Sequence, residues 1–191
     1  MSGLRKTPST GERIVAAAAD LFYSQGINTS GVDAIAEAAG VSKPTLYNLF
    51  GSKQAVVVEA LRRSAARREL LWGEILRGPG TPETRILQIF DWLDQWFQEP
   101  DFRGCALLNA AAELSSDDVE ARRVVTEHKD WVVAALHRVA AEGEWQEPAG
   151  LARGLFLLIE GATAAAFAAG KLSAARDAHA AARRLIASHS P

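Results

Sequence analysis

The sequence predicts an all-α protein with nine helices, and three observations support this. Apolar residues recur at steps of three and four along almost the whole chain, and no stretch alternates as a strand does. Capping residues, glycines and prolines stand where these periodic stretches begin and end. With 191 residues, of which 48% are hydrophobic, the chain can bury a sizeable core.

The first two helices are marked by serines at their starts and glycines at their ends. Ser9 opens a capping-box pattern before the first helix, which Gly26 ends. Ser30 is expected to cap a short second helix over residues 32–39, and Gly40 ends it in the left-handed conformation that glycine favours.

The third and fourth helices also begin at serines. Ser42 is expected to cap a helix over residues 43–50, with Pro44 in the first turn, where the missing N–H costs nothing. Ser52 is expected to cap a long helix over residues 53–77.

Five more helices follow the sequence RGPGTPE, which is the clearest break in the chain. Short stretches rich in Gly, Pro, Ser and Asp separate them. They are expected at residues 82–98, 105–114, 117–142, 149–169 and 173–188.

The second and third helices, joined by Gly-Val-Ser, have the pattern of a helix-turn-helix. In such a unit the second helix enters the major groove of DNA and its first residues meet base edges. Lys43 can donate to guanine, Thr45 offers a hydroxyl and a methyl group, and Pro44 offers an apolar contact.

Other residues of this region suit the phosphate backbone. Tyr47 and Lys53 can bind phosphate oxygens, as can the free N–H groups at the helix starts that Ser30 and Ser52 are expected to cap. The same pattern also fits a small three-helix packing unit with solvated lysines.

Charge is distributed unevenly along the chain. The net charge is −2, which argues against a protein that simply coats nucleic acid. Residues 1–72 hold nine Lys and Arg against six Asp and Glu, whereas residues 73–191 hold twelve against seventeen. This asymmetry points to anion binding at the N-terminal end.

Residues 13–61 resemble the N-terminal domain of TetR-family transcriptional regulators without a gap. The matching features are the first helix ending in LFYSQG, the segment VDAIAEAAGVS, the segment PTLYNLFGSK and the long fourth helix. The resemblance implies a TetR-like fold, with a helix-turn-helix DNA-binding domain over residues 1–52 and a helical effector-binding and dimerisation domain over residues 53–191.

The resemblance also implies partners and site residues. Each subunit of a homodimer would read half of a near-palindromic, double-stranded DNA operator. Leu49 departs from the family pattern and is left out of the site, and Asn48 is added as a further candidate. The implied base-reading residues are Lys43, Pro44 and Thr45, and the implied phosphate-binding residues are Ser30, Ser42, Tyr47 and Lys53.

Aromatic residues are concentrated beyond residue 80, and an apolar cavity with a few polar groups is the usual form of a small-molecule site. We therefore expect a small hydrophobic or aromatic effector; plain core packing is the alternative for each residue. The candidate lining comprises Trp92, Trp96, Phe97, Cys105, Leu108, Asn109, Trp131, Phe156 and Glu160.

Three candidates of this lining have particular chemistry. Asn109 and Glu160 are polar groups within apolar helices and need partners, which for Glu160 could instead be Arg183 or Arg184 across a subunit face. Cys105 stands near a predicted helix start, an environment in which thiols tend to be reactive, so redox or electrophile sensing is an alternative to an inert buried cysteine.

The last two helices are the expected dimer face, because small residues recur along one seam where another helix backbone can come close. Packing within one chain would explain the same seam. The predicted interface residues are Gly154, Gly161, Ala165, Ala168, Ala178, Ala182 and Leu185.

Other classes of function find little support in the sequence. No catalytic or metal-binding motif occurs, so we expect neither an enzyme nor a cofactor. The apolar tract over residues 154–170 contains a glutamate and many Ala and Gly, which favours a buried helix over a membrane span. With one cysteine and no leader pattern, we expect a cytoplasmic protein. The expected function is a repressor released by its effector; a helical dimerisation protein without DNA binding is the remaining alternative.

Overall fold

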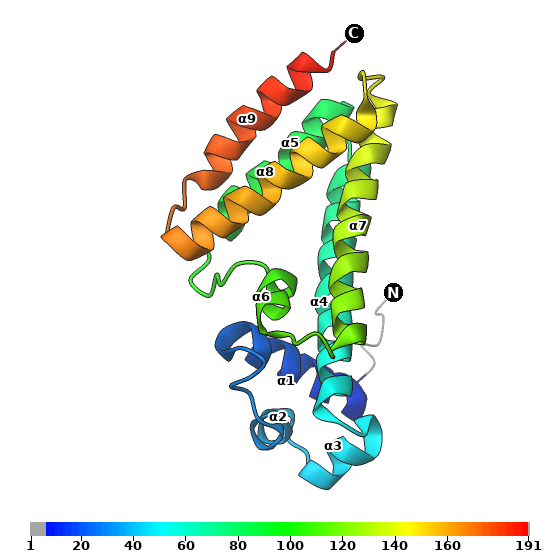
Figure 1. Cartoon of the computed structure of the whole chain (residues 1–191), viewed down its shortest axis with the longest axis vertical. Coiled ribbons are helices and arrows are strands. Elements are labelled where there is room, and N and C mark those ends of the chain that lie inside the picture. The colour runs from blue at the N-terminus through cyan, green and yellow to red at the C-terminus, as the bar shows by residue number, and fades with distance from the viewer. Residues whose placement is uncertain (1–6, 191) are drawn as a thin grey trace. The chain divides into compact units, whose positions relative to one another are not determined.

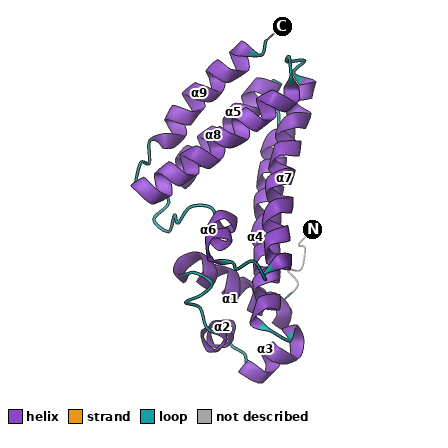
Figure 2. Ribbon diagram, in the orientation of Figure 1, coloured by secondary structure: helices purple, strands orange, loops and turns teal. Residues whose placement is uncertain are grey.

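The computed structural model describes residues 7–190, and this part of the chain is helical without strands (Figures 1 and 2). The predicted all-α class and the order of the elements are confirmed, and the predicted ends agree to within two residues. The helices of the described part are α1 (Thr10–Gln25), α2 (Val32–Ala39), α3 (Lys43–Phe50), α4 (Lys53–Arg77), α5 (Pro82–Trp96), α6 (Ala106–Glu113), α7 (Val119–Glu142), α8 (Pro148–Ala169) and α9 (Ala174–Ser188).

Local chemistry at the ends of the first helix accounts for its position. The Ser9 hydroxyl accepts a bond from the Glu12 N–H at 3.2 Å, and the Glu12 carboxylate accepts one from the Ser9 N–H at 2.7 Å. This is the predicted capping box, which satisfies backbone donors that a helix start leaves without partners. Gly26 ends α1 as expected, with its N–H donating to the Phe22 carbonyl.

The chain forms two compact units. The first comprises the residues up to Ala65 together with Ala106–Val125, and the second comprises Ala66–Cys105 and the residues from Thr126 onward. Helices α4 and α7 each contribute to both units. The functional division predicted at residues 52 and 53 stays a prediction.

The first unit is built around one face of each of its short helices. Ile14 of α1, Ile35 of α2, Leu46 of α3 and Val56 of α4 are fully buried. Helices α1, α2 and α3 also contact one another, so α2 and α3 are held on α1 as a three-helix head. The exposed sides of α2 and α3 remain available for a partner.

The second unit packs α5, α8 and α9 with parts of α4 and α7 around an apolar core. Phe90, Leu93, Leu155 and Ile159 are at most 1% exposed. Helix α9 packs against both α5 and α8. Its contact side consists largely of alanines, which let the helix axes approach closely.

Helix α8 is the one helix of residues 7–190 that has the length and apolar composition to cross a bilayer. The same properties are found in core helices of soluble proteins. Here Leu151, Leu155 and Ile159 form a buried side against the rest of the unit, and Glu160 forms an ion pair with Lys129. We therefore interpret α8 as a core helix.

Candidate DNA interface and effector region

The turn between α2 and α3 has the predicted geometry. Gly40 ends α2 in the left-handed conformation, with φ 63° and ψ 42°, and the Val41 N–H returns to the Ala36 carbonyl at 2.9 Å. The Ser42 hydroxyl accepts a bond from the Thr45 N–H at 3.3 Å and thereby caps α3. The turn therefore fixes the direction in which α3 leaves α2.

Helix α3 turns one side to the core and the other to solvent. Leu46 is fully buried, whereas Lys43, Pro44, Tyr47 and Asn48 are exposed. The first turn of α3 is thus both capped and accessible, as a helix that enters a DNA groove requires. Leu49 is 54% exposed on the same helix.

Lys43 has an acidic neighbour in α2. Its ammonium lies 3.0 Å from a carboxylate oxygen of Asp33, and both side chains are largely exposed. The hydrogen bond to Asp33 and the charge of its carboxylate raise the pKa of Lys43 above its ordinary value. Lys43 is therefore cationic at any physiological pH.

Two of the predicted phosphate-binding residues have internal partners. The Lys53 ammonium donates to the Ile27 carbonyl at 2.6 Å, which places it beside the α1–α2 turn. The Ser30 hydroxyl donates to the Gly26 carbonyl at 2.7 Å, and Ser30 is only 1% exposed.

The predicted capping role of Ser30 is wrong, because the residue before α2 is Gly31, which has no side chain with which to cap it. The Ser30 hydroxyl instead bonds within the preceding turn, and Ser30 lies one residue before the N-cap position of α2. Ser52 caps α4 as predicted, accepting a bond from the Ala55 N–H at 3.1 Å.

A carboxylate that the sequence analysis missed holds the α1–α2 turn. Glu113, the last residue of α6, accepts bonds from the N–H groups of Ile27 at 3.1 Å and Asn28 at 2.8 Å. The preceding Gly26 has φ 92°, and a Cβ added there would lie 2.9 Å from the Glu113 carboxylate. Lys53 binds the carbonyl of the same Ile27, so the turn is held on both sides. We call this arrangement the Glu113 clamp.

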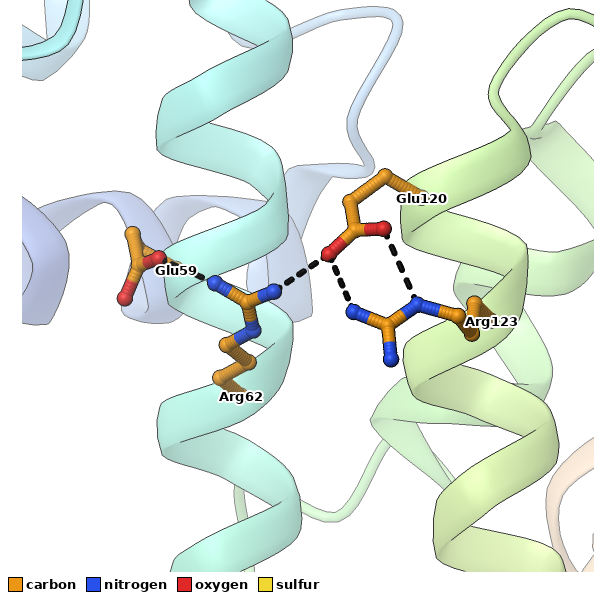
Figure 3. Close-up of polar contacts among 4 residues, drawn as sticks. All are labelled: Glu59, Arg62, Glu120 and Arg123. Atoms are coloured by element: carbon orange, nitrogen blue, oxygen red, sulfur yellow. Dashed lines mark hydrogen bonds and ion pairs between the residues drawn. The ribbon is translucent and has the colours of Figure 1, made fainter.

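Exposed ion pairs join α4 to the start of α7 within the first unit (Figure 3). Arg62 pairs with Glu59 at 2.6 Å and also with Glu120, which in turn accepts bonds from Arg123 at 2.6 and 3.0 Å. The hydrogen bond from Arg123 lowers the pKa of Glu120. Because all four side chains are well exposed, we assign this network a modest structural role.

In the second unit, the predicted lining residues Trp92, Trp96 and Phe97 come together. The rings of Trp92 and Trp96 stack with centroids 5.1 Å apart, and Trp96 lies 5.8 Å from Phe97. Trp72 of α4 meets Trp92 edge-on at 6.0 Å, and Phe102 packs against Trp96 at 4.9 Å. Trp96 and Phe97 are buried, whereas Trp92 is half-buried.

The remaining candidates for the effector site are distributed more widely. Trp131 stacks on His128 with ring centroids 6.4 Å apart, and Phe156 is half-buried at the edge of the core. Leu108 and Asn109 belong to α6, which is part of the first unit. The structure therefore places the nine predicted residues in several groups.

Cys105 and Glu160 meet through a lysine. The Lys129 ammonium lies 2.7 and 2.8 Å from the two carboxylate oxygens of Glu160 and 3.6 Å from the Cys105 sulfur. The partner of Glu160 is thus Lys129 of the same chain, which corrects the suggestion that Arg183 or Arg184 fills this role.

His128 is a buried titratable group of this unit. It is 4% exposed, and its Nδ1 lies 3.0 Å from a carboxylate oxygen of Glu69. Burial lowers the pKa of His128, although the hydrogen bond to Glu69 acts in the opposite direction.

Part of the predicted dimer seam faces the interior of its own chain. Ala178 and Ala182 are 7% and 0% exposed, and a Cβ on Gly154 would lie 2.7 Å from a methyl group of Leu185. Gly154 and Leu185 thus pack α8 against α9, and Ala178 and Ala182 are buried within the chain. The two buried alanines are not available to a second chain, whereas Gly154 and Leu185 are half-buried and stay predicted interface residues.

Gly161 and Ala168 are exposed and Ala165 is half-exposed. Leu157 of the same helix is 67% exposed. One open side of α8 is formed by residues at helical steps of four, three and four, which we call the α8 outer face: Leu157, Gly161, Ala164 and Ala168.

Comparison with known proteins places this architecture among bacterial regulators. Residues 14–60 match the family described as bacterial regulatory proteins, tetR family. The HTH-type transcriptional repressor NemR of Escherichia coli is 27% identical over 136 residues, or 70% of this chain and 68% of NemR. The HTH-type transcriptional activator FasR of Mycolicibacterium smegmatis is 41% identical over 51 residues, or 27% of this chain and 23% of FasR.

Solved structures extend the similarity beyond the head. The crystal structure of the reduced form of E. coli NemR has a TM-score of 0.85 and 25% identity, covering 93% of this chain and 96% of that chain. A TetR transcriptional regulator from Streptomyces avermitilis has a TM-score of 0.78 and 31% identity, covering 92% of this chain and 99% of its own.

Members of this family are non-enzymatic proteins that bind DNA operators and small-molecule effectors, usually as dimers. The family match covers residues 14–60, and the structural similarity to NemR extends over 93% of the chain. The chain belongs to the TetR family of bacterial regulatory proteins and is a DNA-binding transcriptional regulator.

Proposed function

We propose that this regulator is a cytoplasmic repressor that binds a near-palindromic operator as a homodimer and leaves it when a small apolar or aromatic effector binds the second unit. The observation that carries the proposal is the first turn of α3, which is capped by Ser42 and exposed at Lys43, Pro44 and Tyr47. A helix start of this kind offers free N–H donors and side chains together.

The residues of the head divide between two roles. Lys43, Pro44 and Thr45 read bases, because the first residues of a recognition helix reach the base edges. Ser42, Tyr47, Asn48 and Lys53 bind phosphates. Ser30 is not part of this interface, since its hydroxyl is buried and donates within the head.

The α8 outer face supports dimerisation through the second unit. An exposed leucine beside exposed Gly and Ala lets a second helix approach closely and bury apolar area. Two-fold symmetry would pair this face with its own copy, and two heads would then meet two half-sites.

Repression is favoured over activation by the extent of the similarity. The likeness to the repressor NemR covers 70% of the chain, whereas the likeness to the activator FasR covers 27% and is confined to 51 residues. The DNA-binding head alone does not set the sign of regulation, so the longer match is the more informative one.

Selection of bound sequences from a random pool of duplexes tests DNA recognition directly. We expect an enriched near-palindrome, and each half-site should lose affinity when a contacted base pair is changed. The dependence of affinity on salt should give a slope of about −0.9 for each phosphate contact. Equal binding of all duplexes at moderate ionic strength would overturn the proposal.

Redox or electrophile sensing through Cys105 is a second candidate. It is favoured by the Lys129 ammonium 3.6 Å from the Cys105 sulfur and by the NemR crystal structure, which is described as a reduced form. Treatment with N-ethylmaleimide should then weaken operator binding by the wild type and leave Cys105→Ser unaffected. If alkylated wild-type protein binds the operator as before, this candidate fails.

A further inference from the structure

Three tryptophans and an arginine meet between two helices of the second unit. Arg68 and Trp72 lie four residues apart on α4, and Trp92 and Trp96 lie four residues apart on α5. Residues with this spacing share one side of a helix, so each helix turns its pair toward the other. We call Trp72, Trp92 and Trp96 the tryptophan box.

The tryptophan box already holds a flat cation. The central carbon of the Arg68 guanidinium lies 4.1 Å from the ring centroid of Trp96, 4.3 Å from that of Trp92 and 5.6 Å from that of Trp72. Indole faces carry partial negative charge and attract cations at these distances. The box is therefore shaped and charged for a planar positive group.

The cation belongs to a long side chain at the edge of the box. Arg68 and Trp92 are half-buried, whereas Trp72 and Trp96 are 4% and 8% exposed. The box thus has buried walls and one side toward solvent, and the arginine side chain closes that side on a flexible stem. Rotation of Arg68 would uncover the faces of two indoles.

A buried donor distinguishes this cluster from plain core packing. The indole N–H of Trp72 is buried without a hydrogen-bond partner among the described residues. Buried polar groups in proteins are nearly always paired, and one that is not marks a place where a further group can bind. An acceptor atom on a ligand would satisfy this N–H.

We propose that the tryptophan box is a binding site for a planar organic cation, which takes the place of the Arg68 guanidinium. A quaternary nitrogen in an aromatic ring would stack on Trp92 and Trp96, and an acceptor on the same molecule would bind the Trp72 N–H. The claim that this cation is the effector rests on the proposed function. The claim that the tryptophan box binds the cation does not.

Binding of N-methylquinolinium, with neutral 1-methylnaphthalene as its isosteric control, tests the proposal. Titration calorimetry on the full chain should show the cation binding more tightly than 1-methylnaphthalene. Arg68→Met should raise the affinity for the cation about tenfold, because the competing guanidinium is gone. The control Arg67→Met removes the same charge from the neighbouring, exposed position and should leave the affinity unchanged.

A second pair of variants tests the role of Trp92. Adding Trp92→Leu to Arg68→Met should abolish the gain in affinity for the cation, whereas adding Trp145→Leu should preserve it. Thermal melts check that both double variants are folded. Equal affinities of the cation and 1-methylnaphthalene, or of Arg68→Met and the wild type for the cation, would overturn the site.

The operator assay separates the two proposals. If the cation binds and operator DNA is released, both the site and its role as effector site are supported. If the cation binds without release, the site is supported and its role as effector site is refuted. If no duplex is preferred at all, the proposed regulation fails while the calorimetric result for the box still holds.

Discussion

In the proposed complex with DNA, Lys43 would exchange one partner for another. In the free protein its ammonium forms an ion pair with Asp33 of the preceding helix. Exposed ion pairs of this kind contribute little, whereas a contact to guanine discriminates strongly between bases. The exchange would therefore favour operator binding, and Asp33 holds the Lys43 ammonium near the start of α3 in the free protein.

Replacing Lys43 should change which sequences are bound. We expect Lys43→Ala to lower affinity for the selected operator by roughly 10- to 100-fold and to flatten the preference at one base pair of each half-site. Tyr47→Phe, which removes one hydroxyl, should weaken binding to all sequences alike. Competition assays with single-base operator variants measure both effects, and identical profiles for the two variants would contradict these roles.

Glu113 should matter for DNA binding although it is distant in sequence from the head. Glu113→Gln offers one acceptor where the carboxylate offers two, so we expect a loss of about 1–3 kcal/mol in the free energy of unfolding and weaker operator binding. Urea denaturation and a DNA-binding titration measure these quantities.

The control for the clamp is Glu99→Gln, an exposed site in the second unit. It makes the same chemical change away from the α1–α2 turn and should be nearly neutral. A Glu113→Gln protein as stable as this control would show that the clamp contributes nothing.

At the scale of the elements, the α2–α3 turn depends on the conformation of one residue. Gly40 has φ 63° and open space around it, so the cost of Gly40→Ala comes from backbone strain alone. We expect a loss of about 1 kcal/mol. Gly11→Ala in α1 is the matched control, because Gly11 has no positive φ and an added Cβ would meet only Phe50, at an ordinary contact distance of 3.9 Å. A lower melting temperature for Gly11→Ala than for Gly40→Ala would refute this account.

The α8 outer face should determine the oligomeric state. Leu157→Arg places a charge on the proposed contact and should convert the dimer to monomers, which sedimentation velocity at micromolar concentration detects. Val119→Arg makes the comparable change at another strongly exposed apolar residue, in the first unit, and should leave the dimer intact. A wild-type monomer would remove the dimer proposal altogether.

At the scale of the whole molecule, a buried histidine makes stability depend on pH. Burial lowers the pKa of His128 in the folded chain, so the unfolded chain binds a proton more readily. The stabilisation is therefore complete above the ordinary histidine pKa of about 6.5 and is lost as pH falls below it. Melting temperatures between pH 8 and pH 5 should fall less steeply for His128→Gln than for the wild type. The exposed His137→Gln should follow the wild type.

The sequence predicted those features that depend on neighbouring residues. Ser9, Gly40 and Ser42 act within one turn of their own positions, and each was placed correctly. The Glu113 clamp joins residues 86 positions apart, and no local pattern marks it.

The small residues of α8 illustrate the limit of periodicity. A repeat of Gly and Ala indicates that a helix comes close, but it does not say whether that helix belongs to the same chain. Gly154 meets Leu185 of α9, while Gly161 faces solvent. The ion pair between Glu160 and Lys129 was missed for a related reason. Several Lys and Arg residues can pair with one carboxylate, and the sequence does not show which of them lies beside it.

Helix α9 has a consequence for how the protein is made. Its buried side, which includes Ala175, Ala182 and Ile186, covers the apolar surfaces of α5 and α8. The ribosome delivers α9 after both of them, so these apolar surfaces stay uncovered until α9 emerges. A chain truncated before α9 would keep this apolar surface exposed. It would then be prone to aggregate, to bind chaperones and to be degraded by proteases.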